Sequence, residues 1–214
     1  KRQPFMKKIY SLILSMVMMS GLASCTASQN DEDLTDTTSV FRSAMDIYGV
    51  EYASDNISDK NNIPSILAED MCAVLETLRL NSNTQQNCIR TSDNSYEKVI
   101  MNGTYQAVTR SSGNEDFALS VALKFSIEKG QVYYWGTDYS YSSGLFDWSA
   151  QGLSLSPQKD ADGYTYEFES ETFLYFKVSD EADTIVRVPV VFRGSYNFRT
   201  EQGQYYFKLL KYSR

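Results

Sequence analysis

The segment that decides the fold reads Phe117-Ala118-Leu119-Ser120-Val121-Ala122-Leu123-Lys124-Phe125-Ser126-Ile127. Its odd-numbered residues are all large and apolar, whereas its even-numbered residues are small or polar. Side chains of a β-strand alternate between the two faces of its sheet, so this period of two predicts a strand with one buried and one wet face. An antiparallel sheet that packs one face on a core is therefore the expected framework.

Further runs rich in β-branched and aromatic residues surround this segment and predict additional strands. They are Val99–Val108, Val132–Tyr141, Tyr164–Phe168, Phe173–Val178, Ile185–Phe192 and Tyr205–Tyr212. Turns are predicted between them at Gly130, Gly144, Asp162-Gly163 and Gly203. Pro189 cannot donate a backbone hydrogen bond, so we expect it on an edge strand or at a bulge.

Apolar residues at helical spacing precede the strands. The main stripe consists of Leu67, Met71, Val74, Leu75 and Leu78. Asn62 is the predicted cap of this helix, with Pro64 in its first turn. A weaker stripe from Phe41 to Tyr48 predicts a short helix that Gly49 ends.

A helix followed by antiparallel strands predicts an α+β fold, with an N-terminal helix packed on a curved antiparallel sheet. In this order of elements the chain resembles the cystatin-like group of folds. A closed β-barrel with a helical lid is the alternative.

The N-terminal residues have the layout of a secretory signal peptide. Lys7 and Lys8 precede the apolar run Ile9–Met19, which is shorter than the roughly 20 residues of a membrane-spanning helix. Leu22-Ala23-Ser24-Cys25 follows and resembles the lipobox of bacterial lipoproteins. The resemblance implies cleavage before Cys25 and lipid on its thiol. An ordinary secretory signal, with Cys25 as an unmodified thiol, is the alternative.

These features divide the chain into a signal peptide at 1–24, a flexible acidic tether at 25–39 and a single α+β domain at 40–214. The tether holds the cluster Asp31-Glu32-Asp33, which resembles the acidic export signal of surface lipoproteins of the Bacteroidota. A solvated linker explains the same residues. We therefore expect an exported outer-membrane lipoprotein that faces the periplasm or the cell surface.

Net charge excludes one class of partner. Removal of residues 1–24 takes away four basic residues and no acid, which changes the formal net charge from −7 to −11. Nucleic-acid binding requires a basic surface that can neutralise phosphates. We therefore expect no nucleic-acid partner, and attachment to the membrane only through the N-terminal lipid.

Two cysteines remain once Cys25 is lipidated, and an even pair in an oxidising compartment favours a disulfide. Cys72 lies on the predicted helix, and Cys88 follows the polar loop after it. That loop is long enough to return to the helix, so a Cys72–Cys88 bridge is expected. Two thiols, with Cys72 buried against the core, are the alternative.

The composition excludes most catalytic chemistry, because the sequence contains no histidine. Ser–His–Asp triads, Cys–His pairs and imidazole metal sites are all excluded. Paired carboxylates remain possible, and Glu167, Glu169 and Glu171 alternate with aromatic residues on one strand face. A solvated outer face explains these acids better. We expect a non-enzymatic binding or structural role without a cofactor; the alternative is a small carboxylate-dependent hydrolase acting on glycans.

Two short motifs resemble known sites. Gln158–Gly163 with Glu169 resembles an EF-hand calcium loop, so that Asp160, Asp162 and Glu169 are candidate ligands. Gln158 departs from the acid that the first position requires, and a hairpin turn at Asp162-Gly163 is favoured instead. Asp36-Thr37-Thr38 resembles the O-glycan acceptor motif of the Bacteroidota, which makes Thr37 a candidate acceptor.

The most suggestive binding feature is aromatic. Period-two spacing predicts that Tyr133, Trp135, Tyr139 and Tyr141 lie on one strand face, with Trp148 just beyond a turn. A row of flat rings with polar tips is suited to recognising a glycan or a peptide. The same rings could fill the core, and a one-residue change of register decides between the two outcomes.

Replacement of the lipobox cysteine tests the predicted anchor. We expect Cys25→Ala to release the protein from membranes, because the chain would lose its acyl chains and has no spanning segment to replace them. Fractionation of cells that express the variant measures this. Unchanged membrane association would contradict the prediction.

Overall fold

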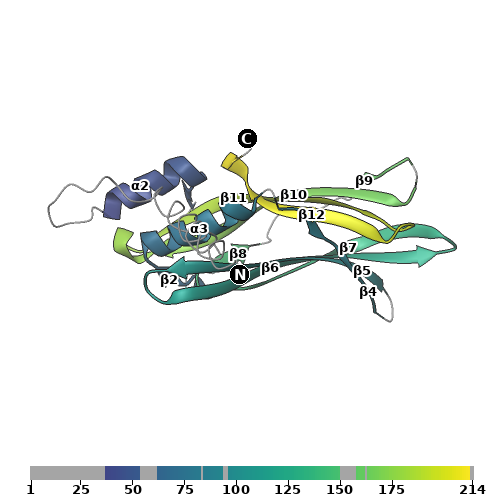
Figure 1. Ribbon diagram of the computed structural model, residues 1–214, viewed down its shortest axis with the longest axis horizontal. Coiled ribbons are helices and arrows are strands. Elements are labelled where there is room, and N and C mark those ends of the chain that lie inside the picture. Colours follow the sequence, from purple (N-terminus) through teal and green to yellow (C-terminus); the bar gives the residue numbers. More distant parts are fainter. Residues whose placement is uncertain are drawn as a thin grey trace, which may run out of the picture.

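The computed structural model describes residues 37–53, 62–82, 84–93, 96–149, 158–161 and 163–212. Strands dominate these ranges, and two helices, α2 (Thr37–Tyr48) and α3 (Ala68–Asn81), lie toward one end of the elongated molecule (Figure 1). Neither helix is long and apolar enough to cross a membrane. Because α2 begins at Thr37, it includes the last residues of the segment predicted as a tether. Cys25 and the signal peptide lie outside the described residues.

The strands form two sheets rather than the single curved sheet expected from the sequence. The small sheet, in the order β4-β5-β6-β7, consists of β4 (Ile89–Asp93), β5 (Tyr96–Thr109), β6 (Gly113–Glu128) and β7 (Gln131–Ser142). The large sheet, in the order β2-β10-β11-β12-β3, consists of β2 (Ser65–Ile66), β10 (Thr165–Val178), β11 (Thr184–Asn197), β12 (Gln202–Leu209) and β3 (Gln86–Asn87). Three short strands extend it: β1 (Glu51–Tyr52) pairs with β11, and β8 (Asp147–Ser149) and β9 (Gln158–Lys159) pair with β10.

Neither sheet closes on itself among the described strands, so the closed-barrel alternative is wrong. The structure is mainly β with two helices, which agrees with the predicted α+β class at a coarse level. Apart from the pairing of β2 with β10, which is parallel, the described strand pairs are antiparallel.

β6 confirms the alternation read from its sequence. Its inward residues, none more than 1% exposed, are Phe117, Leu119, Val121, Leu123 and Phe125. Ile127 breaks the pattern and is 42% exposed, because it lies at the end of the strand beside the turn to β7. That turn consists of Lys129 and Gly130, both with positive φ, as a two-residue type I′ hairpin requires. The predicted turn at Gly130 is therefore confirmed.

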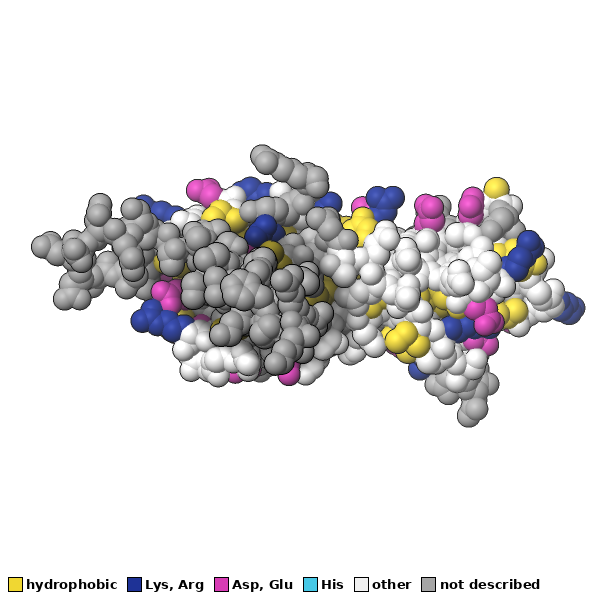
Figure 2. Space-filling view, viewed as in Figure 1, with side chains coloured by type: hydrophobic (Ala, Val, Ile, Leu, Met, Phe, Trp, Pro, Cys, Tyr) yellow, Lys and Arg dark blue, Asp and Glu magenta, His cyan; other side chains and the backbone are white. Residues whose placement is uncertain are grey.

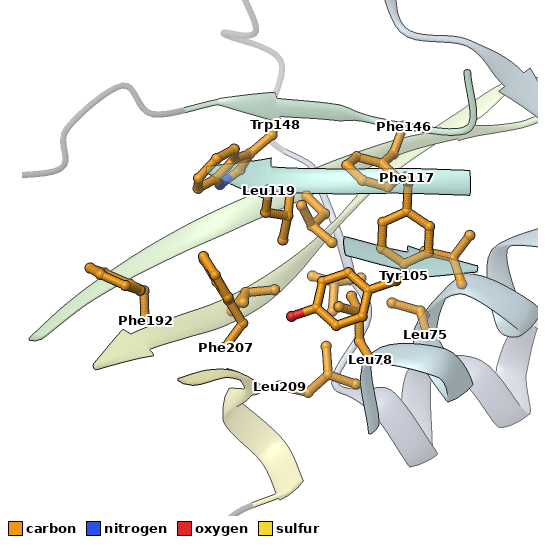
Figure 3. Packing of buried hydrophobic residues seen from close by; sticks show 14 of the residues in the cluster. Leu75, Leu78, Tyr105, Phe117, Leu119, Phe146, Trp148, Phe192, Phe207 and Leu209 are labelled. Atoms are coloured by element: carbon orange, nitrogen blue, oxygen red, sulfur yellow. The ribbon is translucent and has the colours of Figure 1, made fainter. Parts of the chain in front are cut away.

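The core lies between the two sheets, and α3 covers one side of it. α3 packs against β5 of the small sheet and β12 of the large sheet. Leu75 and Leu78 of α3 lie close to Tyr105 of β5 and Leu209 of β12 in this cluster (Figure 3). On the face that Figure 2 shows, acidic and basic side chains lie among one another, and hydrophobic side chains occur in small groups. The apolar residues are therefore gathered mainly inside, where burial stabilises the fold.

The start of α3 differs from the sequence prediction. Ser65 and Ile66, expected in its first turn, pair with the end of β10 as β2, and the helix begins at Ala68. The N-cap residue Leu67 makes no side-chain cap. Instead, Asp180 Oδ1 accepts a hydrogen bond from the Ala68 N–H at 2.9 Å. The cap thus comes from the segment after β10, which helical spacing in the sequence could not reveal.

A second acid holds the same helical turn to the small sheet. Asp70 is only 1% exposed, and its carboxylate accepts hydrogen bonds from the Arg110 N–H at 2.7 Å and the Ser111 hydroxyl at 2.5 Å. Both donors belong to the β5–β6 turn. A buried carboxylate needs such donors, and the helix N-terminus adds a favourable dipole. Nearby, Glu69 forms a more exposed ion pair with Arg110 at 2.8 Å.

Pro189 lies inside β11 rather than on an edge strand. On one side it pairs with Phe173 of β10. On the other side, the pairing with β1 ends at Arg187 and the pairing with β12 begins at Val190. Pro189 therefore occupies a gap between two neighbouring strands, where the missing N–H removes no ladder hydrogen bond on that side.

The expected Cys72–Cys88 disulfide is not present, and both residues are thiols in the structure. The loop after α3 does not fold back; it forms β3, which pairs with Gln204 and Tyr205 near the start of β12. Cys88 is carried to that end of the strand, where its N–H bonds to Gly203 O, whereas α3 lies at the opposite end (Figure 1). Cys72 is buried in the core, and burial raises the pKa of Cys88 to about 12.

Removal of the buried acid tests the attachment of α3. We expect Asp70→Ala to lower the free energy of unfolding by about 2–3 kcal/mol, because it removes the charged acceptor of the hydrogen bonds that hold the β5–β6 turn to α3. Glu69→Ala is the matched control in the same turn and should cost less than about 1 kcal/mol, since its partner is exposed. Urea unfolding measures both variants. Equal losses would contradict the structural role of Asp70.

Candidate binding surface

A bulge in β7 separates the aromatic residues that the sequence placed on one face. Phe125 of β6 pairs with Tyr134, but the preceding residue Lys124 pairs with Gly136. Trp135 is therefore an extra residue in β7. One inserted residue exchanges the faces toward which all later side chains point. The prediction that Tyr133, Trp135, Tyr139 and Tyr141 share a face is wrong for this reason.

Tyr139 and Tyr141 lie after the bulge on the inner face of the small sheet, although Tyr141, near the end of the strand, is still 42% exposed. They pair with Val121 and Leu119, both fully buried residues of β6. The Tyr141 ring stacks on Phe146 at 6.2 Å between centroids. Its hydroxyl donates to Asp147 Oδ1 at 2.6 Å, and this bond raises the pKa of Tyr141 to about 12.

Trp148 belongs to the core and not to a binding surface. Only 5% of it is exposed, and its indole N–H donates to the Thr172 hydroxyl at 2.6 Å. Its ring forms edge-to-face contacts with Tyr139 and Phe207. The ring centroids are 5.9 Å apart in the first pair and 6.4 Å apart in the second. Because β8 joins the large sheet, Trp148 fills the space between the sheets beside β7.

Tyr133 and Trp135 lie before and at the bulge, on the outer face of the small sheet. Trp135 is 61% exposed and Tyr133 is 45% exposed. The Trp135 ring forms an edge-to-face contact with Tyr96 of β5, with 6.0 Å between the ring centroids. Tyr96 is 38% exposed. Its indole N–H donates to Ser126 Oγ at 2.8 Å, which fixes the ring orientation. We call Tyr96, Tyr133 and Trp135 the aromatic platform.

Tyr96 was not recognised as a site residue from the sequence. The alternation from Tyr96 to Val108 indicates only which face of β5 it occupies. Its closeness to Trp135 depends on β5 and β7 flanking β6 in the small sheet, and sequence spacing contains no such information.

Polar groups surround the platform. The Tyr133 hydroxyl donates to Gln131 Oε1 at 2.6 Å. Lys124 Nζ lies 2.7 Å from Asp138 Oδ1, and this hydrogen bond raises the pKa of Lys124. The neighbouring charges are thus paired with each other. Flat rings beside neutral donors and acceptors can bind a ligand that is apolar on one face and polar at its edges.

The three glutamates of β10 share one face, as the alternation predicted. Glu167, Glu169 and Glu171 are all exposed, and Glu169 pairs with Arg193 at 3.6 Å. They succeed one another along a single strand rather than standing on two walls of a cleft. Hydrolysis by two carboxylates requires acids on opposite sides of the scissile bond, and the described acids of β10 do not have that arrangement.

The calcium-like motif forms the hairpin turn that we favoured. β9, at the start of the motif, pairs with β10, which follows the motif. In the turn between them, Asp160 O accepts a hydrogen bond from the Gly163 N–H at 2.9 Å. Asp160 Oδ1 accepts from the Ala161 N–H within the same turn. Asp162 lies outside the described residues, and Glu169 is directed to Arg193. In the described ranges no group of acids and cysteines is arranged to hold a metal ion.

The stability of tryptophan variants distinguishes the two aromatic environments. We expect Trp148→Ala to cost about 3–5 kcal/mol of unfolding free energy, because it empties a packed site and removes the hydrogen bond that the indole donates to Thr172. Trp135→Ala should cost less than about 1 kcal/mol, because its ring is mostly in solvent. Thermal and urea unfolding of the two variants measure the difference. Strong destabilisation by Trp135→Ala would contradict the exposed position of Trp135 and indicate that its ring belongs to the core.

Comparison with known proteins gives a family match over most of the chain. The family model described as "Domain of unknown function (DUF5033)" matches residues 32–209, from the acidic cluster to the last strand. The search of curated proteins and the search of solved structures gave no match. Thr37, the candidate O-glycan acceptor, falls within the matched range as the first residue of α2. From the extent of this match, the chain belongs to the DUF5033 family.

Proposed function

We propose that this chain is a lipid-anchored protein of the bacterial cell envelope that binds a glycan without altering it chemically. The observation that carries the proposal is the aromatic platform. Exposed tryptophan and tyrosine rings in contact with each other are unusual on a surface that serves only for solubility. A sugar ring has an apolar face of C–H groups and polar edges, which match flat rings surrounded by hydrogen-bonding groups.

Preorganisation supports binding at this place. The indole of Trp135 is held by Ser126 and by the edge of Tyr96, and all three residues lie on paired strands. Rings fixed in this way lose little conformational freedom when a ligand arrives, so more of the contact energy contributes to affinity. Exposed acids on β10 lack such a fixed environment, which is why the binding function is preferred over the hydrolase.

The position of the platform suits an anchored protein. The described chain begins at α2, near the end of the molecule where α3 holds the β5–β6 turn. Tyr96 starts β5, and the strand runs from there to Thr109, about 40 Å at the usual rise. Lipid on Cys25 would therefore leave the platform at the end of the domain away from the point where the tether joins. The orientation toward the periplasm or the cell surface follows from export.

Calorimetric titration of the mature chain, carrying Cys25→Ala for solubility, tests the proposed function. The probes are cellohexaose, maltohexaose and mannohexaose, with an uncharged extended peptide as the alternative ligand. We expect a hexasaccharide to bind and Trp135→Ala to weaken it by about tenfold or more. Val108→Ala, an exposed residue at the other end of the same face, is the control and should retain affinity within about twofold.

The outcomes separate the proposed ligand classes. Binding of the peptide but of no hexasaccharide would replace the glycan with a polypeptide partner. Release of shorter sugars during the titration, followed by chromatography, would favour the hydrolase. If the Trp135→Ala protein bound the ligand as tightly as the protein with Trp135, the platform would not be the binding site.

A further inference from the structure

A second surface, on the other sheet, has the properties of a ligand groove. Three adjoining hollows of about 480, 200 and 580 Å³ follow β12 along the outside of the large sheet. The first two share Gln85 and Tyr206, and the last two share Ser195 and Gln204. We call this continuous depression the β12 groove. One side of it is lined by Ser82, Gln85 and Asn87, which lie between the end of α3 and the end of β3.

The floor of the β12 groove is a row of polar residues on neighbouring strands. Ser195 of β11 pairs with Glu167 of β10 on one side and with Gln204 of β12 on the other. Gln204 in turn pairs with Asn87 of β3. Cross-strand partners have side chains on the same face, so these four side chains stand side by side. The next row brings Tyr206, which is partly exposed, beside them.

The charges that line the groove balance. Its cationic residues are Arg193 and Lys208, and its acidic residues are Glu167 and Glu201. Arg193 lies 3.6 Å from Glu169, and Glu201 lies 2.6 Å from Arg90, so part of this charge is satisfied within the protein. A phosphorylated or strongly acidic ligand would require an excess of positive charge. The lining therefore favours a neutral ligand.

The neutral side chains of the groove are suited to hydroxyl groups. The polar ones that reach solvent are Gln85, Asn87, Ser195, Gln202, Gln204 and Tyr206. An amide offers both donors and an acceptor, and a hydroxyl does the same, so each can bond to a sugar hydroxyl in either sense. The partly exposed ring of Tyr206 adds a flat apolar surface for a sugar face.

The backbone of β12 argues against an added peptide strand. A peptide that extends a sheet uses the free N–H and C=O groups of the edge strand. Gln204 and Tyr205 already pair with β3, and Gly203 O accepts the Cys88 N–H at 2.9 Å. Beside these residues a ligand has to be recognised by side chains. From Gln202 to Lys208 the strand advances about 20 Å, which is room for several sugar units rather than one.

We propose that the β12 groove binds a segment of a neutral oligosaccharide. This site lies on the outer face of the large sheet, whereas the aromatic platform lies on the outer face of the small sheet. The inference therefore does not require the platform to bind. Where both sites engage one polysaccharide, the second contact is intramolecular and raises the overall affinity.

Amide chemical shifts of the mature chain carrying Cys25→Ala test the groove directly. The protein is titrated with cellohexaose, maltohexaose and mannohexaose, and with an acidic hexagalacturonate and an uncharged peptide for comparison. We expect a neutral hexasaccharide to shift the amides of Ser195, Gln204 and Tyr206 in a saturable way. Gln204→Ala should weaken this binding by about fivefold or more, because its side chain lies in the middle of the polar row.

Matched variants keep the two sites distinct. Gln106→Ala removes the same amide from an exposed position on β5 and should leave the affinity of the groove unchanged, as should Trp135→Ala. Melting temperatures confirm that each variant is folded. If the ligand changed only the amide chemical shifts of Tyr96, Tyr133 and Trp135, the proposal for the groove would be wrong and the platform would remain the binding site. Preference for the acidic sugar or the peptide, or no shift at Ser195 and Gln204 with any neutral hexasaccharide up to about 10 mM, would also overturn it.

Discussion

Asp70 carries its carboxylate in the first turn of α3, where almost none of it reaches solvent. Such a group is tolerated only when donors replace the lost water, and the β5–β6 turn supplies them through Arg110 and Ser111. Asp180 binds the first N–H of the same helix from the side of the large sheet. The N-terminal turn of α3 is thus fixed to both sheets at once. This double attachment sets the position of the helix over the side of the core between β5 and β12.

The placement of the aromatic residues follows from one inserted residue. Without the bulge at Trp135, a strict period of two would keep Tyr139 on the same face as Tyr133. With it, Tyr139 packs on Trp148 inside, while Trp135 remains outside against Tyr96. The aromatic residues of β7 are therefore divided between the core and the surface. Bulges commonly redirect side chains at functional surfaces in this way.

The two candidate surfaces lie on different sheets and differ in chemistry. The platform offers rings with few charges nearby, and the β12 groove offers amides and hydroxyls along one strand. Both are built on paired strands rather than on loops, which favours a fixed arrangement of the contacting groups.

The sequence by itself determined the features that depend on neighbours along the chain. The buried face of β6, the hairpin turn at Gly130 and the hairpin beside Asp160 follow from local periodicity and turn preference, and all three are present in the structure. The shared face of the β10 glutamates follows in the same way. Each of these needs only the alternation of side chains and the φ angles that residues prefer.

The tertiary structure alone decided the features that depend on distant partners. Residues 65 and 66 became a strand because β10 offered a pairing partner, and Cys88 was drawn away from Cys72 because β12 offered another. The division into two sheets, the contact of Tyr96 with Trp135 and the polar row at Gln204 likewise require strands far apart in the chain. Hydrogen-bonded pairing and core packing choose among registers that the local sequence leaves nearly equal in energy, and a single bulge is enough to change the choice.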